Sequence, residues 1–121
     1  MRLREFEATR LLKAGGIPVP SGIRVVKVDE VAGATEQVGF PLVLKAQVPV
    51  GKRAKAGAIL FADDAVAAVS SAARILQMKV YGHCVDSVLV EQKLDILDEH
   101  YLGVFSNPAS RTPTIIFMRH G

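Results

Sequence analysis

The sequence predicts an α/β or α+β domain built on a mixed β-sheet packed with helices. Segments with helical periodicity alternate with short β-branched runs, in the order helix, strand, helix, two strands, helix and three strands. Most of these runs are bounded by Gly, Pro or Asp, which favour turns and caps. Half of the 121 residues are hydrophobic and 22% are charged, a composition typical of one globular domain.

The first half of the chain contains two predicted helices around one strand. Residues 3–14 place apolar side chains roughly on one face, and Gly15-Gly16 ends that helix. The following Ile-Pro-Val-Pro cannot continue it, because proline lacks the N–H and restricts its neighbour. Residues 23–28 are β-branched and predict a strand. Asp29 is then the expected N-cap of a short helix that Gly39 closes.

The second half begins with a buried-strand pattern over residues 41–45. After a loop rich in Gly, Ala and Lys, residues 58–61 predict another strand. Asp63 or Asp64 caps a helix whose expected apolar stripe is Val66, Val69, Ala73 and Leu76. Residues 81–86 are expected to form a loop. Three further strands are predicted at residues 87–90, 101–106 and 114–118, the last two around an Asn-Pro-Ala-Ser turn.

Composition indicates the cellular compartment and the kinds of partner that we expect for this protein. The single cysteine, Cys84, cannot form an internal disulfide, which favours a reducing compartment. No apolar run is long enough to span a bilayer, and the N-terminus does not have the apolar segment of a signal peptide. We therefore expect a cytoplasmic or mitochondrial-matrix protein without a membrane partner. A net charge of +3 with 6% aromatic residues gives little support to a nucleic-acid partner.

The charges are segregated along the chain. Residues 37–62 contain no Asp or Glu but include Lys45, Lys52, Arg53 and Lys55, whereas residues 91–100 are mainly acidic. One cationic and one acidic segment suit a ligand that carries both phosphates and sugar hydroxyls.

The cationic loop at residues 48–57 could bind phosphate. Its small residues allow close backbone approach, and Lys52 and Arg53 supply opposing charge. It matches neither GxxxxGK[ST] nor GxGxxG, so a solvated basic hairpin is an equal alternative.

Three further residues each have two interpretations. Lys45 ends an apolar strand and either extends to water at a sheet edge or faces a ligand. Glu91 also follows an apolar strand, where it is either an exposed terminus or a partner for a lysine or ligand. Glu99 either accepts ribose hydroxyls or is a surface charge.

No metal site is predicted. The histidines at positions 83, 100 and 120 do not have metal-ligand spacing with each other or with Cys84. No Ser–His–Asp order is evident either, so we predict no catalytic residue within the chain.

Three segments together resemble the β subunit of ADP-forming succinyl-CoA synthetases. The resemblance covers the whole chain, in the family's order and with similar spacing. The matching stretches are Leu3-Arg4-Glu5-Phe6-Glu7-Ala8 through Pro20, Val43-Leu44-Lys45-Ala46-Gln47-Val48 with residues 51–57, and Val88-Leu89-Val90-Glu91 through Gly103.

The resemblance implies the N-terminal lobe of an ATP-grasp domain. It also implies a reaction in which succinate, CoA and ATP give succinyl-CoA, ADP and phosphate, through a phosphohistidine on a partner α subunit. Carried over by position, Lys45 contacts the nucleotide phosphates, and Lys52, Arg53 and Ala54 lie in the phosphate-side loop. Glu91 through Leu94 form the adenine hinge, and Glu99 faces the ribose. The nucleotide is ATP or GTP.

Two features depart from the family. Lys52, Ala54 and Ala58 replace three glycines of a loop that usually reads Gly-Gly-Arg-Gly-Lys-Ala-Gly-Gly, which restricts positive φ and close approach. The second lobe, expected to supply the Mg²⁺ ligands, and the CoA-ligase domain are absent from residues 1–121, so we expect this chain to be inactive alone. The alternative function is a non-catalytic nucleotide-binding or assembly module.

Overall fold

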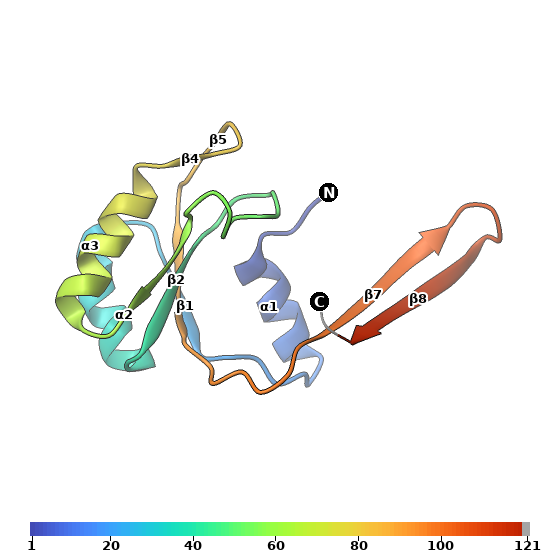
Figure 1. Ribbon diagram of the computed structural model, residues 1–121, viewed down its shortest axis with the longest axis horizontal. Coiled ribbons are helices and arrows are strands. Elements are labelled where there is room, and N and C mark those ends of the chain that lie inside the picture. Colours follow the sequence, from blue (N-terminus) through green and yellow to red (C-terminus); the bar gives the residue numbers. More distant parts are fainter. Residues whose placement is uncertain (120–121) are drawn as a thin grey trace.

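The computed structural model describes residues 1–119 and contains three α-helices, one 3₁₀-helix and eight strands (Figure 1). The helices are α1 (Glu5–Ala14), η1 (Val28–Glu30), α2 (Val31–Val38) and α3 (Ala65–Leu76). The strands are β1 (Gly22–Val25), β2 (Leu42–Ala46), β3 (Ile59–Ala62), β4 (Lys79–Val80), β5 (His83–Cys84), β6 (Val88–Gln92), β7 (His100–Asn107) and β8 (Thr112–Arg119).

The central sheet has four strands in the order β1-β6-β2-β3. Every neighbouring pair is antiparallel, so the expected mixed sheet is wrong in this detail while the α/β class is confirmed. The difference has a topological cause. The connection through α2 joins β1 to β2, and the connection through α3 runs from β3 to β6. Each connection skips one strand, so the parallel strands it joins never become hydrogen-bonded neighbours.

Helices α2 and α3 cover one face of this sheet and enclose the core (Figure 1). The strands direct alternate residues to this face, where Ile23, Leu44 and Val90 are aligned across β1, β2 and β6. Helix α3 begins at Asp64, whose side chain accepts a hydrogen bond from the Ala67 N–H, as expected for an N-cap.

The buried face of α3 differs from the predicted stripe. Ala68, Ala72 and Ile75 are buried, whereas Val66 is 81% exposed and Val69 is 37% exposed. The helix is apolar on nearly all sides, so its periodicity alone does not identify the packed face. Small alanines let the helix approach the sheet closely.

The other face of the sheet is covered in part by α1 (Figure 1). Phe6 is the buried residue of this helix, and the guanidinium groups of Arg4 and Arg24 lie 4.8 and 4.6 Å from its ring centre. The chain therefore fixes α1 at its first turn, directly above the sheet face that carries Lys45.

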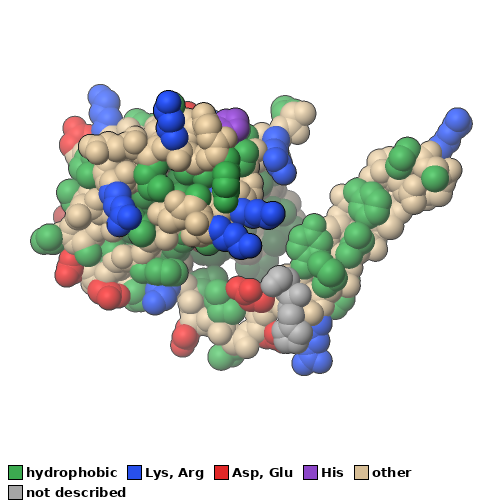
Figure 2. All heavy atoms as spheres, turned by 45° about the horizontal axis from the view of Figure 1, so that its top comes forward, with side chains coloured by type: hydrophobic (Ala, Val, Ile, Leu, Met, Phe, Trp, Pro, Cys, Tyr) green, Lys and Arg blue, Asp and Glu red, His purple; other side chains and the backbone are tan. Residues whose placement is uncertain are grey.

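Strands β7 and β8 form a hairpin that projects away from the rest of the molecule (Figure 1). Leu102, Val104, Ile115 and Phe117 share one face of it and are each more than 60% exposed. Figure 2 shows hydrophobic side chains along this arm. An exposed apolar surface of this kind favours contact with further polypeptide.

Two local expectations are corrected. Asp29 lies inside η1, and Glu30 is the residue at the N-cap of α2, because a 3₁₀ turn precedes the α-helix. The expected loop at residues 81–86 contains β5, which pairs with β4 around Tyr81 and Gly82, both at positive φ. Over residues 1–119, no helix has the length and hydropathy needed to cross a membrane.

Candidate functional site

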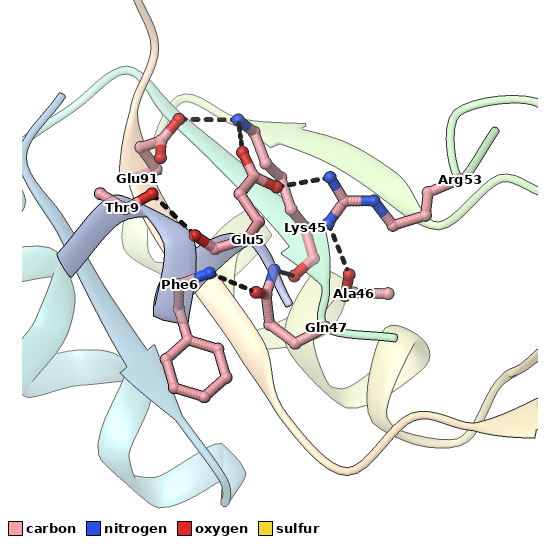
Figure 3. Close-up of polar contacts among 8 residues, drawn as sticks. All are labelled: Glu5, Phe6, Thr9, Lys45, Ala46, Gln47, Arg53 and Glu91. Atoms are coloured by element: carbon pink, nitrogen blue, oxygen red, sulfur yellow. Dashed lines mark hydrogen bonds and ion pairs between the residues drawn. The ribbon is translucent and has the colours of Figure 1, made fainter. Parts of the chain in front are cut away.

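A cluster of charged side chains lies on the sheet face beneath α1 (Figure 3). Lys45 on β2 and Glu91 on β6 are diagonal neighbours, since Lys45 pairs with Leu89 and Val43 pairs with Glu91. The Lys45 Nζ lies 2.7 Å from Glu91 Oε1 and 2.8 Å from Glu5 Oε1. The lysine therefore bridges a carboxylate of the sheet and one of the helix.

Lys45 does not extend to water at a sheet edge, and Glu91 is not an exposed strand end. Lys45 lies on a central strand and its side chain is only 19% exposed, while the Glu91 side chain is 8% exposed. The strand register places both groups on the face that α1 partly covers. The structure therefore has the paired arrangement of Glu91 with a lysine.

Arg53 joins this cluster from the loop between β2 and β3. Its guanidinium donates to the second carboxylate oxygen of Glu5 and to the Ala46 carbonyl, the latter at 2.9 Å. The loop closes on Arg53 itself, because the Ala58 N–H donates to the Arg53 carbonyl at 3.0 Å. The side chain of Arg53 is 18% exposed, so this cation is held inside the loop and does not extend into solvent.

Gln47 fixes the position of α1 relative to β2 (Figure 3). Its side-chain carbonyl accepts from the Phe6 N–H, and its amide donates to the Lys45 carbonyl, both at 3.0 Å. Gln47 is 1% exposed, and a buried amide that satisfies two backbone groups fixes both elements. It therefore sets where Glu5 meets Lys45.

The contacts within the cluster shift the pKa values of Glu5 and Lys45. Burial raises the pKa of Glu5, but hydrogen bonds and charges from Lys45 and Arg53 outweigh it and hold this pKa below its ordinary value of 4.5. Burial likewise lowers the pKa of Lys45, but Glu5 and Glu91 outweigh it and hold this pKa above its ordinary value of 10.5. Glu5 and Lys45 are therefore both charged near neutral pH.

Two hollows adjoin the cluster. One has a volume of about 470 Å³ and is lined by Glu5 together with Arg2, Lys52, Arg53 and Ala54. The other, of about 510 Å³, is lined by Glu91 along with α1 and the segment leading into β1. The 470 Å³ hollow, which the cations Arg2, Lys52 and Arg53 line, could therefore accept an anionic group.

The backbone of the cationic loop is strained at Lys52. This residue has φ of 58°, in the left-handed region that glycine adopts at little cost. The Tyr81 hydroxyl of the β4–β5 turn donates to the Lys52 carbonyl at 3.4 Å. The β4–β5 turn therefore contacts the loop at its residue of positive φ.

The structure brings only some of the predicted residues together. Lys45, Arg53 and Glu91 belong to one cluster, and Lys52 and Ala54 line the adjoining hollow with Arg53. Leu94 and Glu99 lie beyond β6 in an exposed segment that leads to the β7–β8 hairpin. Neither residue lines either hollow. Within residues 1–119, the Glu99 carboxylate makes no hydrogen bond or ion pair in the structure.

Two central residues were missed by the site prediction. Glu5 contacts both cations, and Gln47 holds Glu5 in place through Phe6. The available signal was an acidic residue in the first turn of α1 within the stretch that resembles the family. The partners of Glu5 could not be identified from sequence, because Lys45 and Arg53 lie 40 and 48 residues further along the chain.

The described residues do not fit a magnesium site. Mg²⁺ prefers carboxylate and phosphate oxygens. Within residues 1–119, no group of three or more His, Cys, Asp or Glu side chains could hold a metal ion. Glu5 and Glu91 both contact Lys45, and Lys45 and Arg53 occupy both oxygens of Glu5 and one oxygen of Glu91. His120 lies outside the described residues.

The comparisons with known proteins agree with this architecture. The family pattern described as ATP-grasp domain matches residues 2–121. The chain belongs to the ATP-grasp family. A solved structure from Pyrococcus horikoshii has the same fold, with a TM-score of 0.86 and 25% identity over 98% of this chain and 52% of that one.

ATP-grasp relatives with curated names are similar over the full chain. The "Succinate--CoA ligase [ADP-forming] subunit beta" of Halorubrum lacusprofundi is 40% identical over 121 residues, covering 100% of this chain and 32% of the relative. The protein of the same name from Methanocaldococcus jannaschii is also 40% identical, with 33% of its length covered. The chain thus spans about a third of the length of the curated relatives it matches.

Proposed function

We propose that this ATP-grasp segment binds the nucleotide of an ADP-forming acid–CoA ligase. In the complete enzyme, succinate, CoA and ATP would give succinyl-CoA, ADP and phosphate, with the phosphoryl group carried on a histidine of a partner α subunit. The observation that carries this proposal is that Glu5 of α1 holds two cations, Lys45 and Arg53, beside the 470 Å³ hollow. Similarity to succinate–CoA ligase β subunits over the full chain supports it.

The proposed roles of the phosphate-side residues follow the 470 Å³ hollow, and those of the base and ribose residues follow the resemblance to the family. The phosphates of ATP or GTP would lie in the hollow lined by Lys52, Arg53 and Ala54. Lys45 would reach them from behind Glu5, which lines this hollow and contacts Lys45. The base would lie toward Glu91 and Leu94, and Glu99 would face the ribose. Fixed cations beside a water-accessible hollow suit phosphate, because charge-assisted hydrogen bonds are stronger than neutral ones.

Several parts of this proposal depend on polypeptide beyond these residues. Phosphoryl transfer depends mainly on positioning and on neutralising charge. Mg²⁺ would neutralise phosphate charge, and its protein ligands would come from the second lobe. This chain would contribute nucleotide binding and orientation, in a complex with the α subunit, in the cytoplasm or the mitochondrial matrix.

Calorimetric titration of ADP into Lys45→Ala and wild-type protein tests the assignment. Removing one fixed cation should weaken binding by about tenfold, the usual effect of a charge-assisted hydrogen bond. Lys27→Ala is the matched control, because Lys27 is exposed and carries the same charge at a distance from both hollows. Equal affinity of the Lys45 and Lys27 variants would contradict the proposed function.

The β7–β8 hairpin favours a second candidate function, a non-catalytic assembly module. Its exposed face pairs Leu102 with Phe117 and Val104 with Ile115 across the two strands. A Leu102→Ser/Phe117→Ser double variant should reduce self-association in light scattering if this face assembles chains. A module that assembles but binds no ADP at millimolar concentration would support this alternative over the nucleotide-binding function.

A further inference from the structure

Glu5 holds the two cations that the proposed function assigns to phosphate. One carboxylate oxygen is 2.8 Å from Lys45 Nζ, and the other accepts from the Arg53 guanidinium (Figure 3). A carboxylate that bridges a lysine and an arginine uses the same donors as a phosphate group. Glu5 and a phosphate therefore cannot both make these contacts.

Glu5 is also the more accessible of the two carboxylates on Lys45. Its side chain is 27% exposed and lines the 470 Å³ hollow, whereas that of Glu91 is 8% exposed. An entering ligand would therefore reach the contacts of Glu5 first. Glu91 would remain on Lys45 and keep it oriented after Glu5 had left.

The first turn of α1 allows such an exchange without moving the helix. The Phe6 N–H is held by Gln47, and the Arg4 guanidinium is held by Asp86 at 3.0 and 3.1 Å. These anchors lie on either side of Glu5 in sequence. A rotation of the Glu5 side chain alone would free Lys45 and Arg53.

We propose that Glu5 is an internal substitute for a ligand phosphate, which holds Lys45 and Arg53 until a polyphosphate displaces it. This inference rests on the proposed function and adds a competitor to it. The residue would lower the affinity for every anion, and it would favour di- and triphosphates, whose several charges make them the strongest competitors. Phosphate monoesters and carboxylates would displace it poorly.

The opposite role for Glu5 would be a support that keeps both cations in a binding arrangement. The two roles differ in the sign of one measurement. Removing a competitor tightens binding, whereas removing a support weakens it.

Titration of inorganic tripolyphosphate and ADP into Glu5→Gln, measured by calorimetry, tests the proposal. We expect both probes to bind about five- to tenfold more tightly than to wild type, because each charge-assisted contact becomes available to the ligand. Glu7→Gln is the matched control, since Glu7 lies in the same helical turn and contacts Arg4 instead. It removes the same charge, and its effect should stay within about twofold, as for an exposed group.

Glu5→Asp separates contact from net charge. It keeps the negative charge, but its shorter side chain cannot reach both cations from the same backbone position, so binding should again be tighter than in wild type. Circular dichroism checks that each variant is folded. If Glu5→Gln does not fold, Glu5→Asp replaces it as the test variant.

The proposal would be overturned if the Glu5 variants bound tripolyphosphate and ADP no more tightly than Glu7→Gln does. It would also be overturned if none of the variants bound either probe. The Lys45→Ala result separates the two hypotheses. If Lys45→Ala weakens binding but the Glu5 variants do not tighten it, only the competitor role fails. If Lys45→Ala has no effect, the nucleotide-binding assignment fails and the competitor role fails with it.

Discussion

Replacing Lys45 with Met should destabilise the fold through the carboxylate that it leaves behind. Glu91 would lose its only ion-pair partner within residues 1–119, and its side chain is 8% exposed. Breaking a fully buried pair in this way typically costs about 3–5 kcal/mol. Glu5 keeps Arg53 and is partly hydrated, and Met replaces the aliphatic stem of the lysine, so we expect about 2–3 kcal/mol.

Urea denaturation at pH 7 measures this cost. For a domain of this size, with an m-value of about 2 kcal/mol/M, the midpoint should fall by about 1–1.5 M. Adding Glu91→Gln to Lys45→Met removes the orphaned charge and should recover at least half of the loss. Lys27→Met controls for the loss of an exposed cation and should shift the midpoint by less than about 0.3 M.

A Lys45→Met midpoint close to that of the Lys27 control would refute the reasoning, since Glu91 would then be hydrated. So would a double variant that is no more stable than Lys45→Met alone. In that case the loss would come from packing, and Glu91 would not be its source.

The remaining predictions concern pH, backbone strain and the core. The lowered pKa of Glu5 contributes stability above about pH 4.5 that is lost on acidification through its folded-state value. The raised pKa of Lys45 contributes stability below about pH 10.5 that is lost as pH rises through its folded-state value, so Glu5→Gln should flatten both limbs of a stability–pH curve. Lys52→Gly should raise the unfolding free energy by about 0.5–1 kcal/mol by relieving its positive φ, and Lys52→Ala, which removes the same charge, should not. Leu44→Ala at a fully buried core position should cost about 3 kcal/mol in the same urea assay.

The sequence predicted the local elements better than their pairing. The helices α1 and α3 and the strands β2 and β6 lie within a few residues of the expected positions, because caps, glycines and apolar runs mark their ends. The insertion of β6 between β1 and β2 could not be predicted in the same way. Such pairing depends on contacts between residues far apart in sequence, which local periodicity does not encode.

The contacts within the candidate site also join residues far apart in sequence, so only some of its members could be predicted. Lys45 and Glu91 were recognisable as charged residues at the ends of apolar strands, but their contact depends on the register of β2 against β6. Glu5 was harder to predict, because nothing in residues 3–14 indicates that α1 crosses the sheet above Lys45. Resemblance to a family supplied the ligand class, and the fold supplied the partners.

The charges around the 470 Å³ hollow suggest different kinetic roles for its cations. In the cluster, Lys45 and Arg53 are matched by Glu5 and Glu91, so its formal charge is zero. Long-range attraction of an anion must then come from exposed cations such as Arg2 and Lys52, which line the hollow outside the cluster.

Lys52→Ala should therefore slow ADP association and reduce its salt dependence, whereas Lys45→Ala should mainly speed dissociation. Stopped-flow measurements at two salt concentrations separate these effects. Equal changes in both rate constants for both variants would mean that the cluster attracts the ligand directly, and that Glu5 does not neutralise it.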